Sequence, residues 1–204
     1  VVDRLNNIYV AGYTTGMNSG MDFTTIKYNN SGNILWTNVY NDTNVNLNDK
    51  AFGIVVDSDR NSYVTGYTTA DTAGITDYLT MKINQNGETE WKNTYNGKGN
   101  FQDTAFAICL PKHSDGVYVT GGSSRIDSAG NLDAVTLKYT RKDGLLVDSS
   151  RFNGTDNLND VANCVFSDTS GNVYIGGFTQ TIADSYNILL VKYYRGLLLG
   201  IEQV

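Results

Sequence analysis

The sequence predicts an all-β protein, a β-propeller built from four four-stranded antiparallel blades, which could form part of a larger ring. Three observations predict this fold. A unit recurs four times. Each copy contains a Tyr-Val or Tyr-Ile pair and a glycine three residues after the tyrosine, and successive glycines are 54, 55 and 56 residues apart. Each unit holds four short segments rich in Val, Ile, Tyr and Thr, and no segment shows a sustained helical period. Such a repeat is typical of one propeller blade. The four glycines are Gly12, Gly66, Gly121 and Gly177.

The second repeat, residues 49–102, is the most regular and shows the expected strands most clearly. We name them A to D in chain order. Strand A is expected over Ala51–Val56, strand B over Ser62–Thr69, strand C over Tyr78–Ile83 and strand D over Thr89–Tyr95. Gly, Asn and Asp bound all four, as they commonly bound strands. An ordinary β-sandwich is the alternative fold, but a sandwich does not require a fixed repeat.

Turn and glycine positions add detail to this blade. Asn86-Gly87 predicts a two-residue hairpin turn, because both residue types accept positive φ angles. Gly66 lies inside strand B, where a glycine indicates close approach of another backbone. Alternate residues of strand B point to opposite faces, and Tyr63 and Val64 are both apolar. Both faces of the blade are therefore expected to pack against neighbouring blades.

The remaining repeats are residues 1–48, 103–159 and 160–204, and we treat residues 1–204 as one propeller unit. The repeats depart from this pattern at the two ends of the chain. Val1-Val2-Asp3 matches Val55-Val56-Asp57, the end of strand A, so the first repeat lacks most of that strand. At the other end, residues 197–204 replace the expected strand D. We therefore expect an incomplete ring and self-association through exposed blade edges, since unpaired strands readily pair with another chain.

Composition restricts the possible partners. The 204 residues carry a net charge of −6, with a pI of about 4.6 and no basic cluster. This balance argues against nucleic acid and anionic membranes as partners. No apolar run reaches the length of a membrane helix, so no membrane insertion is expected. Cys109 and Cys164 fall in A strands of successive repeats. They are expected to pack as small buried residues, because separate blades make a disulfide unlikely, and their redox state stays open.

Candidate metal and catalytic groups are sparse. Asp57, Asp59 and Asn61 alternate like calcium ligands, but the loop lacks a distal Glu, and a polar turn is the favoured interpretation. His113, the only histidine, lies in an expected turn without evident partners for a triad or a zinc site. No pair of carboxylates suggests acid–base work on glycosides. We expect no catalytic residue and no cofactor.

The candidate ligand face follows from the strand order. B–C and D–A connections share one end of every blade and vary between repeats, and variable loops on a rigid scaffold commonly carry recognition. The B–C loops are expected at residues 14–21, 68–76, 123–132 and 179–186. Tyr13, Tyr67 and Phe178 follow the strand B glycines, close to the B–C loops, and either pack between blades or stack on sugars. The charged candidates on this face are Asp71, Arg125 and Asp127.

A lysine recurs in every C strand, which suggests a structural role. The recurring aspartates at the starts of the A strands are the expected partners, in shielded ion pairs. The lysines are Lys27, Lys82, Lys138 and Lys192, and the aspartates are Asp49, Asp103 and Asp160.

These motifs resemble those of a known family. The run from Asp57 through Tyr63-Val64-Thr65-Gly66, then Asp77-Tyr78 and Lys82, then Asn86-Gly87 and Trp91, is similar to the SBBP family of bacterial β-propeller repeats. The resemblance covers the whole chain and implies a non-enzymatic binding or scaffolding module of extracellular or cell-surface proteins, with a glycan or protein partner. A signal peptide would lie outside this segment. The alternatives are a propeller lyase or hydrolase acting on glycans and, with less support, a fragment of a quinone-dependent dehydrogenase.

Overall fold

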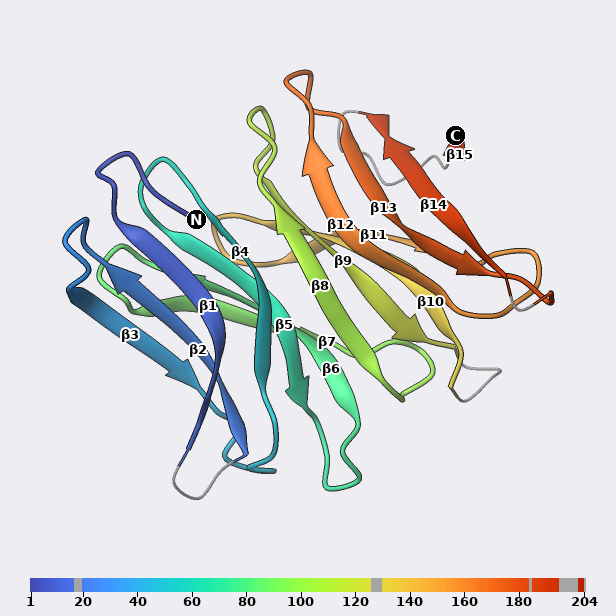
Figure 1. Cartoon of the computed structure of the whole chain (residues 1–204), viewed down its shortest axis with the longest axis horizontal. Helices are drawn as coiled ribbons and strands as arrows, with labels where there is room; N and C mark the ends of the chain where they lie inside the picture. Colours follow the sequence, from blue (N-terminus) through green and yellow to red (C-terminus); the bar gives the residue numbers. More distant parts are fainter. Residues whose placement is uncertain (17–19, 126–129, 184, 195–201, 204) are drawn as a thin grey trace.

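The computed structural model describes residues 1–16, 20–125, 130–183, 185–194 and 202–203, which form four antiparallel sheets arranged in series (Figure 1). The first sheet contains β1 (Ile8–Thr15), β2 (Met21–Tyr28) and β3 (Ile34–Tyr40). The second contains β4 (Lys50–Val56), β5 (Ser62–Thr69), β6 (Thr76–Ile83) and β7 (Thr89–Tyr95). The third contains β8 (Asp103–Cys109), β9 (Gly116–Ser124), β10 (Leu132–Thr140) and β11 (Leu146–Phe152). The fourth contains β12 (Asp160–Ser167), β13 (Val173–Gln180), β14 (Tyr186–Tyr193) and β15 (Glu202–Gln203).

We call these sheets blades 1 to 4, and each follows the predicted A-B-C-D order. In blade 2 the observed β5 and β7 match the expected strands B and D, and strands A and C begin one and two residues earlier than expected. The sheets do not close into a ring, and blade 1 has only three strands. Val1 and Val2 occupy the end of its missing strand A, since Val2 pairs with Ile8 and the Val1 carbonyl accepts a hydrogen bond of 2.9 Å from the Tyr9 amide.

Three apolar clusters lie between successive blades, which is the packing of a propeller array and not of a two-sheet sandwich. Between blades 1 and 2, Phe23 packs with Val64 and Leu79, all three fully buried. Both faces of blade 2 are thus covered, as the alternating apolar residues predicted. Indole groups complete two of these junctions: Trp36 Nε1 donates to Gln85 O (3.0 Å), and Trp91 Nε1 donates to Arg141 O (3.2 Å).

The glycine prediction for strand B is confirmed in the covered blades. A Cβ on Gly66 would lie 1.9 Å from the Lys50 carbonyl oxygen, because a bulge between Ala51 and Gly53 brings β4 close to β5. Gly121 and Gly177 meet the same contact from β8 and β12. Nothing lies within 4 Å of the equivalent position on Gly12, where strand A is missing.

The two-residue turn predicted at Asn86-Gly87 is wrong. Five residues, 84–88, connect β6 and β7, and of this pair only Gly87 has a positive φ, of 92°. The reason is the side chain of Asn84, whose Oδ1 accepts hydrogen bonds from the amides of Asn86 and Glu88. An Asn side chain that binds the backbone two residues ahead stabilises a wider turn, here followed by a bulge in β7 at Glu90.

The predicted pairing of lysines with the A-strand aspartates is also wrong. Each of the four lysines instead lies over the ring of the tyrosine opposite it on strand B, with Lys82 Nζ 5.7 Å from the Tyr63 centroid and Lys27 Nζ 4.9 Å from that of Tyr9. Lys82 also pairs with Glu90 at 2.7 Å. Lysines near the ends of C strands and aspartates at the starts of A strands lie at opposite ends of a blade. Cation–π contact is the structural role that the lysines have.

Candidate functional site

The long connections gather at one end of the blades, as the strand order requires. We call this end the loop face, defined by the B–C loops at residues 14–21, 68–76, 123–132 and 179–186 and the D–A loops at 41–48, 96–102 and 153–159. Three of the B–C loops contain residues outside the described part of the chain, namely 17–19, 126–129 and 184. The opposite end carries the A–B and C–D turns.

A hollow of about 290 Å³ opens on the loop face where blades 1, 2 and 3 meet. Its polar wall includes Thr76 and Gln102, whose side chains are hydrogen-bonded to each other at 2.8 Å. Its aromatic wall is Tyr67, and the Phe52 ring stands 5.8 Å from Tyr67 and 5.9 Å from Phe106. Phe52 is 46% exposed, so this row of rings borders solvent. The full lining is Leu47, Asn48, Tyr67, Thr69, Gly74, Thr76, Gln102 and Thr104.

A second hollow, of about 260 Å³, repeats this arrangement between blades 3 and 4. It is lined again by a D–A loop, at residues 153–156, and by the end of strand B with the start of the B–C loop, at residues 179–181. Phe152 and Asn187 complete the lining. The repeat therefore builds hollows of similar size at blade junctions on the loop face.

Near these hollows, buried aspartates hold each D–A loop to the blade that follows it. Asp103 begins β8, and its carboxylate accepts hydrogen bonds from the amides of Gly97 (2.5 Å) and Ser124 (2.9 Å). Asp49 accepts equivalent bonds from the amides of Asp42 and Thr69. Asp160 accepts one from the amide of Gly154. Each of these aspartates thus ties the D–A loop before it to its own blade, which fixes the shape of the loop face.

A second set of buried carboxylates begins the C strands, at Asp22, Asp77 and Asp133. Each has one buried oxygen, Oδ1, without a hydrogen bond among the described residues. Burial, with a further contribution from the carboxylate of Asp103, raises the pKa of Asp77 to about 6. An uncompensated carboxylate in a buried site favours its neutral form.

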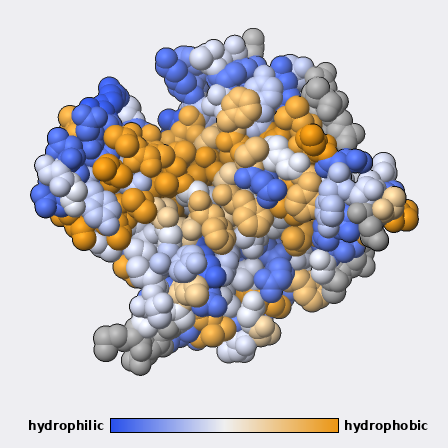
Figure 2. Space-filling view, in the orientation of Figure 1, coloured by the Kyte–Doolittle hydropathy of each residue, from blue (hydrophilic) through white to orange (hydrophobic). Residues whose placement is uncertain are grey.

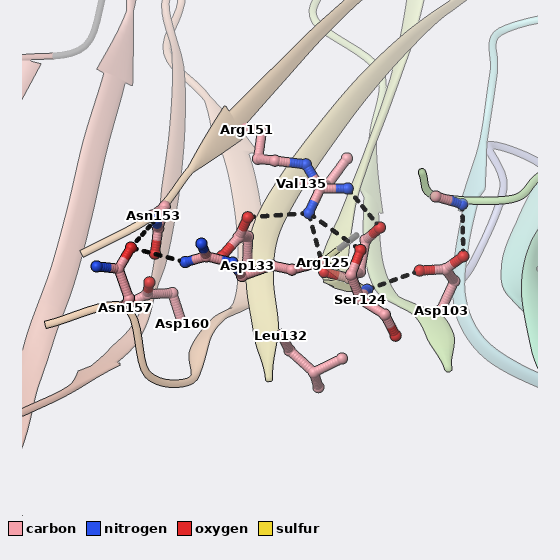
Figure 3. A network of polar contacts seen from close by, with 12 residues as sticks. Asp103, Ser124, Arg125, Leu132, Asp133, Val135, Arg151, Asn153, Asn157 and Asp160 are labelled. Carbon is pink, nitrogen blue, oxygen red and sulfur yellow. Dashed lines mark hydrogen bonds and ion pairs between the residues drawn. The ribbon is translucent and has the colours of Figure 1, made fainter. Parts of the chain in front are cut away.

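In blade 3, arginines compensate this carboxylate (Figure 3). Arg151 Nη1 lies 3.0 Å from Asp133 Oδ2 and also donates to the Ser123 carbonyl oxygen at 3.0 Å, while Arg151 Nη2 donates to Ser123 Oγ at 2.8 Å. Arg125 Nη1 lies 4.0 Å from Asp133 Oδ1 and 2.8 Å from Asn157 Oδ1. Burial still raises the pKa of Asp133, while Arg151 and Arg125 oppose the shift.

The structure spreads the predicted ligand residues along the loop face. Tyr67 lines the first hollow, Tyr13 is 50% exposed with Lys50 Nζ 4.9 Å from its ring centroid, and Phe178 packs edge-on against Tyr186 at 5.2 Å. Asp71 shapes its own loop, because its Oδ1 accepts hydrogen bonds from the amides of Ala73 and Ile75. Arg125 belongs to the network around Asp133 and is only partly exposed. Asp127 lies outside the described residues.

The calcium-like segment forms a polar turn at the opposite end of blade 2. Asp57 Oδ1 accepts hydrogen bonds from the amides of Asp59 and Asn61, and Oδ2 accepts from Asn61 Nδ2 and from the Tyr63 hydroxyl. Both oxygens of Asp57 are thus used by the turn. A hollow of about 380 Å³ lies beside it, lined by Asp3, Arg4, Leu5, Asp57, Ser58 and Arg60.

The remaining reactive side chains do not converge. Cys109 is buried, which raises the pKa of its thiol to about 12, and both cysteines are free. The prediction that both are buried is wrong for Cys164, which is exposed because none of the strands in the described part of the chain packs on this side of blade 4. His113 lies exposed in a turn. Among the described residues, no group of three His, Cys, Asp or Glu side chains is placed to hold a metal ion, and no helix has the length and apolarity needed to cross a membrane.

The sequence interpretation missed the C-strand aspartates and Arg151. A signal for the aspartates was present, since Asp22, Asp77 and Asp133 recur five residues before the lysine of the same strand. Arg151 occupies the position of Thr94 in blade 2, so it appears in the sequence only as a departure from the repeat. The partner of Arg151 becomes evident only from the cross-strand register.

A family model and a solved structure are similar to this chain. Among solved structures, the chain is similar to a protein of unknown function from Bacteroides caccae, with 11% sequence identity and a TM-score of 0.34, over 96% of this chain and 82% of that chain. No curated protein matches. A family model described as SBBP beta-propeller repeat matches residues 43–71, which span the D–A loop of blade 1 and strands A and B of blade 2. This match at residues 43–71 confirms the resemblance to SBBP β-propeller repeats that the motifs predicted.

Proposed function

We propose that this chain is a non-enzymatic binding or scaffolding module of an extracellular protein, and that its partner, a glycan or a protein, docks on the loop face. The observation that carries the proposal is the hollow of about 290 Å³ at the junction of blades 1, 2 and 3. Its walls come mainly from two D–A loops, a B–C loop and the end of a strand B, and these loops vary between repeats.

The lining chemistry suits a sugar ring better than an apolar ligand. Asn48, Thr69 and Gln102 each make hydrogen bonds within the protein, and the remaining donor and acceptor positions of their side chains can exchange hydrogen bonds with sugar hydroxyls. The ring of Tyr67 offers a face for the apolar side of the sugar. The volume is at the lower end of ligand sites, which suits one or two sugar units. The position is fixed, since Asp49 and Asp103 hold the adjoining loops by buried hydrogen bonds.

An enzyme acting on glycans is the alternative, and the carboxylates beneath the hollow are its candidate acids. Asp77, with a pKa raised to about 6, and Asp103 would be the acid and base of such a site. However, Asp77 Oδ1 is buried, and the Asp103 oxygens accept backbone hydrogen bonds, so neither group reaches a ligand in this conformation. The dehydrogenase alternative has less support, because Trp36 and Trp91 are engaged in packing between blades.

The test is a glycan array followed by calorimetric titration of each ligand found. We expect Gln102→Ala and Tyr67→Leu to weaken binding at least about tenfold while the thermal melt stays within a few degrees. Control variants at the opposite face, Asp59→Ala and Lys142→Ala, change exposed turn residues and should bind as the unaltered protein does. If the controls lose binding and the loop-face variants keep it, the partner docks at the other end, where the hollow beside Asp57 would be the site. Turnover of a bound glycan would favour the enzyme.

A further inference from the structure

The junction between blades 1 and 2 buries a carboxylate without a counter-charge. Asp77 begins β6 one residue after Thr76, is 8% exposed, and its Oδ1 has no hydrogen bond among the described residues. Alternate residues of a strand share a face, so Asp77 lies on the side of β6 that carries Leu79, which packs with Phe23 of blade 1. The carboxylate of Asp103 adds negative charge near it. A cation bound beside Asp77 would therefore compensate a buried charge.

Blade 3 shows which partner the same carboxylate takes when the chain supplies one. Arg151 Nη1, which comes from the neighbouring strand β11, lies 3.0 Å from Asp133 Oδ2. The same nitrogen lies 3.0 Å from the carbonyl oxygen of Ser123 and 3.4 Å from that of Ser124. A positively charged group is thus surrounded by one carboxylate oxygen and two backbone carbonyl oxygens. Hard metal cations take ligands of these two kinds.

Blade 2 repeats these three oxygens but not the guanidinium. The strand registers of the two blades match, so Asp77 and the carbonyls of Thr68 and Thr69 correspond to the three oxygens around Arg151 Nη1. Thr94 takes the place of Arg151 on β7, and its side chain carries no charge. Blade 2 therefore has the oxygen ligands of a cation site without the arginine that fills the site in blade 3.

No described side chain replaces the arginine in blade 2. Lys92 of β7 lies over the Tyr40 ring, 4.6 Å from its centroid, and among the described residues none forms an ion pair with Asp77. Blade 4 avoids the charge, because Asn187, a neutral amide, occupies the same register position there. In the described parts of blades 2, 3 and 4, only Asp77 therefore occupies this position as a charge without a partner.

The position also suits a hydrated cation. The strand β6 begins at the loop face, and Figure 2 shows hydrophilic residues over much of this end of the molecule, at the bottom of the view, below the apolar centre. An ion therefore reaches the start of β6 through polar surface.

We propose that the junction of blades 1 and 2 binds a calcium ion, held by the carboxylate of Asp77 and the carbonyl oxygens of Thr68 and Thr69. Calcium accepts carboxylate, carbonyl and water oxygens in flexible geometry, so water completes its shell, whereas magnesium demands a stricter octahedron. A single carboxylate ligand places the affinity in the weak range of calcium sites, with a Kd on the order of 1 mM. Two of the three protein ligands are backbone carbonyls, so the site needs no group of three acidic side chains.

Urea melts at pH 8, with and without calcium at constant ionic strength, test the proposal. We expect about 10 mM calcium chloride to raise the equilibrium constant for folding about tenfold, because the ion binds the folded state only. Asp77→Asn should remove this response. Thr94→Arg, which brings a guanidinium to the place that Arg151 fills in blade 3, should remove it too. Asp59→Ala, which removes an exposed carboxylate at the opposite end of blade 2, is the matched control and should respond as the unaltered protein does.

An NMR titration of the side-chain carboxyl carbons with calcium chloride at pH 8 locates the ion. We expect the Asp77 resonance to move with a midpoint on the order of 1 mM, that of Asp59 to stay unchanged, and magnesium chloride to give a smaller response. An Asp77 resonance that calcium does not move would overturn the proposal, and so would a stabilisation by calcium that survives in Asp77→Asn. If Asp59→Ala alone loses the response, the ion binds the polar turn beside Asp57 and the proposed site is wrong.

Discussion

Blades 2 and 3 bury the same carboxylate in two different ways. Asp77 and Asp133 begin their C strands at matching positions, 8% and 3% exposed, and each has one oxygen without a hydrogen bond. In blade 3 the guanidinium of Arg151 reaches Asp133 from the neighbouring strand. In blade 2 the matching position holds Thr94, whose short side chain carries no charge.

The difference teaches how a repeat can keep a buried charge. A charge removed from water is stable only with a partner, and otherwise the group shifts its pKa towards the neutral form. Blade 3 supplies the partner, whereas blade 2 leaves Asp77 close to Asp103 with a pKa raised to about 6. One repeat position thus has an ion pair in one blade and a proton that exchanges near neutral pH in another.

The largest expected effect comes from removing the arginine. Arg151→Met leaves Asp133 buried without its partner and removes the hydrogen bonds to Ser123, so the free energy of unfolding should fall by about 3 kcal/mol at pH 8. The loss should be smaller at pH 5, because Asp133, now with a still higher pKa, takes up a proton in the folded state. Urea melts at both pH values measure this.

The matched control for that experiment is Thr94→Met in blade 2. Thr94 is exposed and supports no ion pair, so the change should alter stability by less than about 0.5 kcal/mol. If Arg151→Met costs no more than this control at pH 8, the arginine does not compensate Asp133.

The second effect is a gain in stability from Asp77→Asn. Below pH 3.8, the ordinary pKa, Asp77 is protonated in both states and its burial carries no charge penalty. As pH rises towards about 6, the unfolded state releases the proton and the folded state holds it, so folding weakens. Above about pH 6 the penalty is complete. The variant should therefore be more stable by about 2 kcal/mol at pH 8 and nearly unchanged at pH 4.

Urea melts from pH 4 to pH 8 follow this effect, with Asp133→Asn as the comparison. Burial also raises the pKa of Asp133, but Arg151 and Arg125 oppose that shift, so this change should gain less stability at pH 8 than Asp77→Asn does. An Asp77→Asn variant with the same pH profile as the unaltered protein would show that Asp77 does not titrate near pH 6.

Most of the fold could be predicted because it follows from local pattern. Short alternating strands and the fixed glycines define the blade, and β5 and β7 begin and end where the pattern indicated. The turn at Asn84 was missed because its geometry depends on a side chain that accepts two backbone amides. The aspartates could have been excluded as partners of the lysines, since the strand order alone places the start of strand A and the end of strand C at opposite ends of a blade.

The candidate site was less predictable, because it depends on contacts between blades. Tyr67 was identified from its place after a glycine, but the hollow that it lines needs residues from three blades. Arg125 was identified as an exposed ligand residue, yet its guanidinium lies near Asp133. Exposure of Cys164 depends on what packs against blade 4, and this is not encoded in a repeat read one copy at a time.

The smallest expected effect transfers the arginine of blade 3 to blade 2. Thr94 pairs across from Leu79 as Arg151 pairs across from Val135, so the side chain of a Thr94→Arg variant starts from the position that reaches the C-strand carboxylate in blade 3. The second contact of Arg151, with Ser123, has its counterpart in Thr68, whose hydroxyl donates to Asp49 Oδ1 at 2.6 Å and can still accept a hydrogen bond. Because Thr94 is exposed, we expect a gain of only about 1 kcal/mol at pH 8.

The same variant should lower the pKa of Asp77 from about 6 towards its ordinary value, since a nearby cation favours the carboxylate. An NMR titration of the Asp77 side-chain carboxyl carbon measures this directly, and Thr94→Gln, a side chain of comparable reach without charge, is the control. A lower pKa together with a flatter stability profile between pH 4 and pH 8 would show that the two blades differ by one counter-charge. An unchanged pKa would mean that the loops around Asp77, and not the missing arginine, distinguish the two blades.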